Sequence, residues 1–405
     1  MHVYKTISFQ ELFSPSTDHF LRSFYKIGNS NISDGMDLHF ELIEKTRTKK
    51  KSPILQLATP DDAQEIVDIY LDIYQGTYPY KEMEDIKEVR RMIESSGYRW
   101  LLFKIANSDK IAGCFTYQLD FEKKHGYMRG FNVKREFHGI LDSIKAVIGS
   151  MIGVWTEYKN QIKLWYCENR TAHTKSQYLS NVCGIKPIAF LPKKDRFNGR
   201  IESDIMHIAY EFDTLSDLRS LNIPRFIPEV ESFFQYSNNR YNLGQYKIDD
   251  PQSALNLKNL GGIERDIHVK IEEHKFGYKT IRFSLQHKGS FFTFLYNPHV
   301  QNFEKTEYKV SNNEELFLFL WKWLELIESF HVRYAECLVS AYRPEDQKLF
   351  KKIGFSPRGY LPSWHYNKRS NTFEDYVMFN WCKGPIYNTP NLLESGEALF
   401  KLTRF

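Results

Sequence analysis

A short polar run with acid–base chemistry interrupts the apolar middle of the sequence, from Glu168 to His173 (ENRTAH). The Glu168 carboxylate could take a proton from an amine, directly or through water, and the His173 imidazole could share that proton. Arg170 could pair with an acidic group or a phosphate. The same residues also suit the capped start of a helix, with Glu168 and Arg170 as an ion pair, so both interpretations stay open at this point.

A second candidate site lies where an apolar strand turns toward a helix, from Phe131 to Gly139 (FNVKREFHG). A turn of this kind presents backbone N–H groups at a helix N-terminus, which favours the binding of an anion. An ordinary strand-to-helix connection is the alternative.

The surrounding periodicity predicts the elements that position both sites. We expect a strand at 54–58, a helix capped by Thr59, and a second helix at 86–95. Strands at 99–106, 111–119 and 126–134 follow, and then a helix at 140–158, a strand at 162–168, a helix at 172–183, and strands at 185–191 and 201–210. This alternation predicts an α/β or α+β domain.

The end of this pattern recurs later in the chain. Residues 177–192 and 347–362 align without a gap, lie 170 residues apart, and share six of sixteen identities, including Gln177/Gln347 and Gly184/Gly354. Helix termination explains the two glycines only, since Gly commonly ends helices. The shared glutamine and two shared prolines favour a duplicated domain.

The second copy is expected to contain strands at 280–285, 291–296 and 307–310, a helix at 314–330, a strand at 332–340, a helix at 344–352, and strands at 355–361 and 373–381. The predicted organisation is an N-terminal extension and linker (1–53), a first domain (54–215), a connection (216–264), a second domain (265–385) and a tail (386–405).

Composition excludes several classes of protein. Of the 405 residues, 42% are hydrophobic and 26% charged, which argues against disorder and coiled coil. No apolar run is long enough to span a membrane, and no signal peptide is evident. The net charge of +5 falls short of a nucleic-acid binder. Five scattered cysteines without metal-ligand spacing predict buried thiols, no structural zinc and a cytoplasmic location.

Three segments together resemble the GNAT (general N-acetyltransferase) superfamily. The segment 57–63 (LATPDDA) is similar to its first strand–helix junction, and 131–139 to its central strand and pyrophosphate loop. The helices that end at Gly184-Ile185 and Gly354-Phe355 are similar to its late helix. The resemblance covers residues 54–212 fully and 265–382 in part. It implies two GNAT-like domains, each a mixed, mostly antiparallel sheet flanked by helices, with a degenerate second copy.

The resemblance also implies a reaction, in which acetyl-CoA or another acyl-CoA gives its acyl group to a small-molecule or peptide amine. In this family the central strand binds the pantetheine arm and the following turn binds the pyrophosphate. The residues carried over to the donor are Phe131, Val133, Lys134, His138, Gly139, Ile140, Leu141 and Asn169. Glu168 and His173 are the candidate bases.

The sequence departs from the family at two points. The loop keeps one glycine and adds Asp142, which brings a negative charge toward the phosphates. Ser180 stands where many members have a tyrosine that acts as a general acid. Two alternatives therefore remain: a transferase that uses aminoacyl-tRNA on the same tandem fold, and a non-catalytic binding or scaffold protein. Nucleic acid is a partner only in the first of these.

Overall fold

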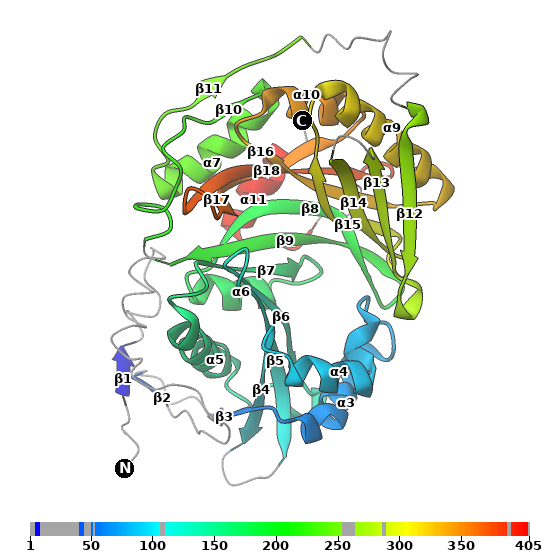
Figure 1. Cartoon of the computed structure of the whole chain (residues 1–405). Coiled ribbons are helices and arrows are strands. Elements are labelled where there is room, and N and C mark those ends of the chain that lie inside the picture. The colour runs from blue at the N-terminus through cyan, green and yellow to red at the C-terminus, as the bar shows by residue number, and fades with distance from the viewer. Residues whose placement is uncertain are drawn as a thin grey trace. The chain divides into compact units, whose positions relative to one another are not determined.

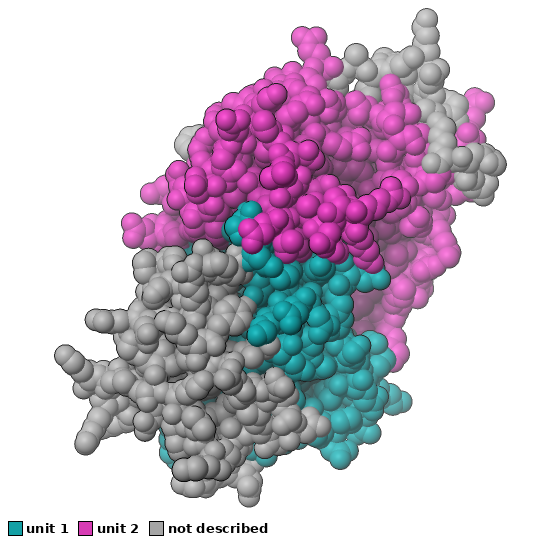
Figure 2. All heavy atoms as spheres, turned by 60° about the vertical axis from the view of Figure 1, so that its left-hand side comes forward, with its two compact units in different colours: residues 1–187, 197–200, 206–216 teal, residues 188–196, 201–205, 217–405 magenta. Residues whose placement is uncertain are grey.

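A computed structural model describes residues 5–8, 40–43, 50–51, 53–105, 110–211, 213–252, 264–285, 289–386 and 390–403. The chain forms two compact units (Figure 2). Unit 1 consists of residues 1–187, 197–200 and 206–216, and unit 2 of residues 188–196, 201–205 and 217–405. Within the described ranges, no helix is both long and apolar enough to cross a membrane.

Unit 1 is built on a mixed sheet (Figure 1). Its strands lie in the order β3 (Pro53–Leu57), β4 (Tyr98–Ile105), β5 (Ile111–Asp120), β6 (His125–Val133) and β7 (Leu164–Arg170). All neighbours are antiparallel except β6 and β7, which are parallel. This mostly antiparallel α/β architecture confirms the predicted fold class.

Helices cover both faces of this sheet, because successive side chains of a strand point to opposite faces. On β4, Leu101 and Phe103 belong to the core that contains α5 (Ser143–Tyr158). Trp100 and Leu102 belong to the core of α3 (Ala63–Tyr74) and α4 (Ile86–Glu94). A strand buried on both sides explains why β4 is apolar almost throughout. The last helix of this unit is α6 (Lys175–Val182), which follows β7.

Unit 2 contains a sheet of the same connectivity. Its strands lie in the order β12 (Ile267–Glu273), β13 (Lys279–Leu285), β14 (Ser290–Asn297), β15 (Asn302–Lys309), β16 (Tyr334–Ser340), β18 (Thr372–Cys382) and β17 (Ser356–Asn367). The helices are α9 (Asn313–Ser329), α10 (Pro344–Lys352), α7 (Glu231–Tyr241) and α11 (Glu394–Leu402). The order from β13 to β18 repeats the order from β4 through β8 (Lys186–Phe197) and β9 (Arg200–Tyr210).

The structure explains the glutamine that the two repeats share. The Gln177 side-chain amide donates to the carbonyl of Arg170 at the end of β7, at 3.2 Å. The Gln347 amide donates to the equivalent carbonyl of Ser340 at the end of β16, at 2.8 Å. Both glutamines are buried. Each therefore ties its helix to the end of the preceding strand, through a side-chain bond over seven residues that sequence periodicity does not reveal.

The structure adds detail to three of the predicted segments. The helix expected at 140–158 begins at Ser143, because Leu141 bridges to Lys51 before the helix starts. The predicted connection contains α7, whose Ser237 hydroxyl donates to the Tyr360 carbonyl. The predicted tail contains α11. The boundaries of the two domains stay a prediction.

β6 carries an extra residue opposite β5. Asn132 pairs with Cys114 and Arg129 pairs with Thr116, so two residues of β6 face one residue of β5. This is a β-bulge, which bends a strand and re-aims its side chains. Gly130 within the bulge has φ of +64°, and a Cβ there would lie 1.9 Å from the Tyr70 hydroxyl oxygen. Only glycine fits this position without rearrangement.

We expect Gly130→Ala to lower the free energy of unfolding by about 3 kcal/mol, because left-handed strain and overpacking add together. Gly139→Ala is the matched control: its φ is +79°, but no atom lies within 4 Å of the added Cβ. That control should lose only about 1 kcal/mol. Urea unfolding followed by tryptophan fluorescence measures both variants. If the two variants lose the same free energy of unfolding, the role assigned to the Tyr70 contact is wrong.

Candidate functional site

The central feature of unit 1 is the divergence of two parallel strands. β6 and β7 pair only at three positions, His125 with Leu164, Gly126 with Trp165, and Tyr127 with Tyr166. The Tyr127 and Tyr166 rings stack there with centroids 4.8 Å apart. Beyond this point β6 stays paired to β5 as far as Val133. One edge of residues 128–133 is therefore outside the β6–β7 ladder.

The end of β6 shows which way this edge faces. The Lys134 N–H donates to the Ala112 carbonyl in the direction of β5, at 2.8 Å. Because a trans peptide points its C=O and N–H in opposite directions, the Val133 carbonyl faces the open edge. The His138 Nε2 lies 2.9 Å from that carbonyl oxygen. Lys134 itself pairs with Glu65 of α3. Phe131 and Val133 are half-buried against the core that contains α5.

The turn after β6 uses most of its own N–H groups. The amide of His138 donates to the Arg135 carbonyl, and the amides of Ile140 and Leu141 donate to the Phe137 carbonyl. Gly139, with its positive φ, is the remaining residue of the predicted set. The predicted loop therefore binds a phosphate with three of its amides only if these internal bonds open.

The start of α5 is tied to the segment that precedes β3. The Lys51 amide donates to the Ile140 carbonyl at 2.8 Å, and the Asp142 amide donates to the Lys51 carbonyl at 2.9 Å. The Asp142 carbonyl accepts from the Ala146 amide, so Asp142 is the N-cap residue of α5. Its buried carboxylate lies at the positive end of the helix dipole, where an anion would otherwise be favoured.

The polar run at the end of β7 is divided between the two faces of the sheet. The Tyr127 hydroxyl donates to Glu168 Oε2 at 3.3 Å. Arg170 lies on the same face, with its guanidinium carbon 4.0 Å from the centroid of the Phe197 ring. His173 follows the strand in an exposed turn, where its backbone carbonyl accepts from Gln177. The structure thus places Glu168 beside the point at which β6 and β7 diverge, which we call the fork. His173 lies beyond it.

Asn169 points to the opposite face and organises a buried network. Its Nδ2 lies 2.8 Å from the Ser180 hydroxyl oxygen and 3.0 Å from His207 Nδ1. The Cys167 sulfur lies 3.5 Å from the same hydroxyl oxygen. Asn169 and His207 are only 7% and 2% exposed. If Asn169 donates to Nδ1, His207 is neutral, and the network holds the Ser180 hydroxyl in a fixed position.

Sequence reasoning did not select two residues of this region, His207 and Arg129. His207 lies in the buried second half of β9 (residues 205–210), where a histidine among mostly apolar neighbours was the available signal. The Arg129 side chain is 8% exposed and lies 3.5 Å from Glu82 Oε1. Its guanidinium carbon lies 4.7 Å from the Tyr80 ring centroid. Burial lowers the pKa of Arg129, but Glu82 and the surrounding tyrosines raise this pKa by more, so Arg129 keeps its charge.

Around the bulge, the buried polar groups come from β6 and α3. The Tyr74 hydroxyl donates to Asn132 Oδ1 at 3.1 Å. The Tyr70 hydroxyl and Asn132 Nδ2 are buried without a hydrogen-bond partner within the described residues. Burial raises the pKa of Tyr70 well above its ordinary value. Unsatisfied buried groups next to the fork provide polar contacts that a ligand could complete.

Unit 2 contains the same fork with different residues. β15 and β16 pair only at Asn302 with Tyr334 and at Phe303 with Ala335. The next two positions are Glu304 and Glu336, and Lys194 Nζ lies 3.0 Å from Glu336 Oε2. Burial raises the pKa of Glu304 to about 7. The repeat aligns Asn169 with Val339 and Ser180 with Phe350, so the hydrogen-bonded network of unit 1 is absent here.

Two further observations concern the cysteines and the possible metal ligands. Four of the cysteines are buried thiols and Cys382 is half-buried. Over the ranges that the structure describes, no group of three or more His, Cys, Asp or Glu side chains is arranged to hold a metal ion.

Comparison with known proteins gives a likeness of fold. No known protein-family profile matches the sequence, and no curated protein is significantly similar to it. Among solved structures, a spermidine N-acetyltransferase from Vibrio cholerae matches with 13% identity and a TM-score of 0.33, covering 39% of this chain and 94% of that chain.

Two further acetyltransferases match to a similar extent. The ribosomal alpha-N-protein acetyltransferase RimL, in complex with coenzyme A, has 14% identity and a TM-score of 0.33, covering 42% of this chain and 98% of its own. The microcin self-immunity acetyltransferase MccE, in complex with acetyl-CoA and AMP, has 18% identity and a TM-score of 0.31, covering 41% and 97%. Over 39–42% of its length, the chain is similar to solved GNAT acetyltransferases.

Proposed function

We propose that the protein is an N-acyltransferase that transfers an acyl group from acetyl-CoA or another acyl-CoA to an amine. The observation that carries this proposal is the divergence of β6 and β7 beyond Tyr127. An extended donor with amide groups can pair with an open strand edge as an added strand does. The open edge of residues 128–133 therefore suits the pantetheine arm, with Phe131 and Val133 as its backbone partners.

The donor's pyrophosphate fits the turn after β6 less completely. Gly139 and the first turn of α5 offer N–H groups, because the first amides of a helix have no partner within it. Lys134 and His138 lie at the same end of β6. The internal bonds of His138, Ile140 and Leu141 must open or be bypassed, and the bond between His138 and Val133 must give way to the donor.

The proposed acyl transfer uses side chains on both faces of β7. The attacking amine forms the new N–C bond as the C–S bond of the thioester breaks. Glu168, beside Tyr127, takes the proton that the amine loses. On the other face, the Ser180 hydroxyl, held by Asn169, donates a hydrogen bond to the departing thiolate. His173 is the alternative base at the exposed end of the same segment.

The location of this chemistry is proposed to be unit 1 alone. The fork of unit 2 contains two carboxylates and a lysine where unit 1 has a pair of tyrosines. Val339 and Phe350 replace the asparagine and serine of the network. A thioester would there meet buried charges and apolar side chains. Unit 2 is then a degenerate second GNAT-like domain, as the repeat predicts.

A second donor class has an observation in its favour. The occupied amides of the turn and the N-cap carboxylate of Asp142 both disfavour a pyrophosphate at the start of α5. An aminoacyl-tRNA donor has no pyrophosphate at that position, so it avoids this conflict. RNase-sensitive transfer without affinity for coenzyme A would favour this alternative. If the protein shows neither RNase-sensitive transfer nor affinity for coenzyme A, a non-catalytic scaffold protein is favoured.

Replacing Asp142 tests the placement of the pyrophosphate. Asp142→Asn keeps an N-cap of equal quality but removes one negative charge. If the pyrophosphate lies at the start of α5, coenzyme A should bind about fivefold more tightly, or about 1 kcal/mol. Glu136→Gln, an exposed acid in the same turn, is the control and should have little effect. Isothermal titration of coenzyme A measures both. An unchanged dissociation constant in Asp142→Asn would argue against this placement.

Replacing Glu168 tests the base. Glu168→Gln keeps an oxygen that accepts from Tyr127 but cannot take a proton, so kcat should fall about 100-fold or more. Glu94→Gln, at the exposed end of α4, is the control. The assay follows thiol release from acetyl-CoA with spermidine and an N-terminal peptide as trial amines, the substrate classes named for the similar acetyltransferases. A normal kcat in Glu168→Gln with intact donor binding would exclude Glu168 as the base.

A further inference from the structure

Unit 2 contains a cavity of about 480 Å³. It is lined by residues from the end of α10, from β17 and β18, from the chain after β18, and from the end of α11: Gly354, Arg358, Asn380, Cys382, Gly384, Pro385, Ile386 and Thr403. None of these residues is acidic. The volume falls within the range of small-molecule sites in proteins.

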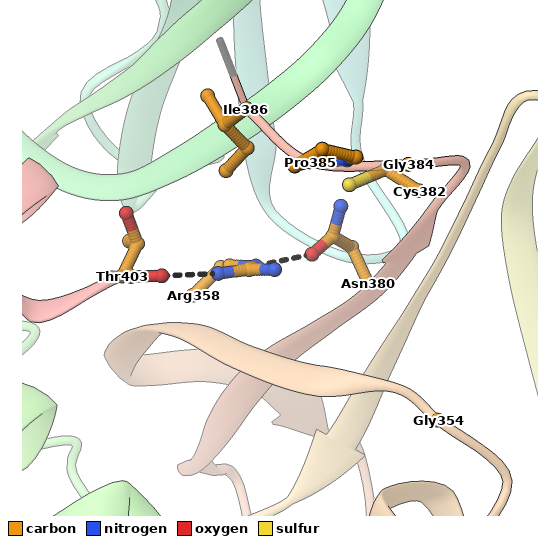
Figure 3. Close-up of a pocket in the computed structure, with 8 residues that line it drawn as sticks. All are labelled: Gly354, Arg358, Asn380, Cys382, Gly384, Pro385, Ile386 and Thr403. Carbon is orange, nitrogen blue, oxygen red and sulfur yellow. Dashed lines mark hydrogen bonds between the residues drawn. The ribbon is translucent and has the colours of Figure 1, made fainter. Parts of the chain in front are cut away.

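Arg358 is the charged group of this cavity, and it is 9% exposed. Its Nε donates to Asn380 Oδ1 and its Nη1 donates to the Thr403 carbonyl at 3.0 Å (Figure 3). Both partners are neutral. Within the described residues, no carboxylate forms an ion pair with Arg358. A buried charge without a counter-charge is costly, and a bound anion would remove this cost.

Asn380 supplies a second, independent observation. Because its Oδ1 accepts from Arg358, its Nδ2 points away from the guanidinium, toward the segment of Cys382, Gly384 and Pro385 (Figure 3). Asn380 is 1% exposed, and its Nδ2 has no hydrogen-bond partner within the described residues. This N–H donor therefore faces the cavity without an acceptor, beside a guanidinium without an anion.

The rim adds further positive charge. The Lys193 Nζ donates to the Lys383 carbonyl at 2.8 Å, and it lies 3.7 Å from the position of a Cβ on Gly384. Burial raises the pKa of the Cys382 thiol, while Arg358, Lys193 and Arg333 act in the opposite direction. Lys193 thus adds a positive charge near a cavity that already contains Arg358 and whose other walls include the apolar Pro385 and Ile386.

The geometry points to an oxyanion-binding site in unit 2, which takes a carboxylate or phosphate group between Arg358 and Asn380 Nδ2, with a short apolar body against Pro385 and Ile386. Arginine suits this task because its guanidinium stays charged, and within the described residues Nη2 remains for an oxyanion while Nε and Nη1 bind Asn380 and Thr403. This site is separate from the proposed acyl-transfer site of unit 1 and does not depend on it.

Cys382 provides a local readout, since the other four cysteines are buried. The full chain is alkylated with iodoacetamide, and the rate at Cys382 is measured by peptide mass spectrometry. Succinate and inorganic phosphate are the two probes, with sodium chloride at equal ionic strength as the control. At about ten times the dissociation constant, a probe in the cavity should slow the alkylation of Cys382 about tenfold. Protection by succinate alone assigns a carboxylate ligand, and protection by phosphate assigns a phosphate ligand.

Two variants separate binding from a purely structural role of Arg358, which also binds the end of α11 through Thr403. Asn380→Asp keeps the acceptor for Arg358 but supplies its missing counter-charge, so protection should disappear while the fold is retained. Arg358→Met should also lose protection, although it weakens the end of α11. Absence of protection by either probe in the unchanged protein, or protection that persists in Asn380→Asp, would overturn the proposal.

Discussion

The extra residue in β6 is the constraint on which the candidate site depends. Two parallel strands remain paired only while both keep a regular extended backbone, and Gly130 breaks that regularity in β6. The bulge is held by α3, since the Tyr70 hydroxyl fills the space that any side chain at this position would need. Helix packing on one face of the sheet thus determines where the edge of β6 becomes available. The stacked tyrosines at 127 and 166 mark the last paired position.

The two units share a scaffold but fill it differently. The buried glutamines Gln177 and Gln347 make the same bond to the end of a strand, and both following helices end at a glycine of positive φ. Both features shape the backbone between a strand and the next helix, and both units have them. The side chains at the forks differ, with tyrosines in unit 1 and glutamates in unit 2. Shared architecture therefore does not imply shared chemistry.

The sequence was sufficient to predict the fold class and most elements, because strands such as β4 and helices such as α9 have strong periodic patterns. It also identified Glu168 and Asn169 as residues at the end of a strand. It could not predict the network of Asn169 with His207, which joins residues 38 positions apart. Nor could it predict that the turn amides bind the Phe137 carbonyl, because that depends on local backbone geometry rather than on residue type.

The pair of main-chain bonds between Lys51 and the start of α5 links the beginning of the first sheet to the turn after β6. A shortened chain that starts at β3 would keep the strands from β3 to β7 yet leave the Ile140 carbonyl and the Asp142 amide without these partners. The choice of the first residue in a recombinant fragment therefore affects the turn that is proposed to face the donor, and a fragment used to measure donor affinity has to retain Lys51.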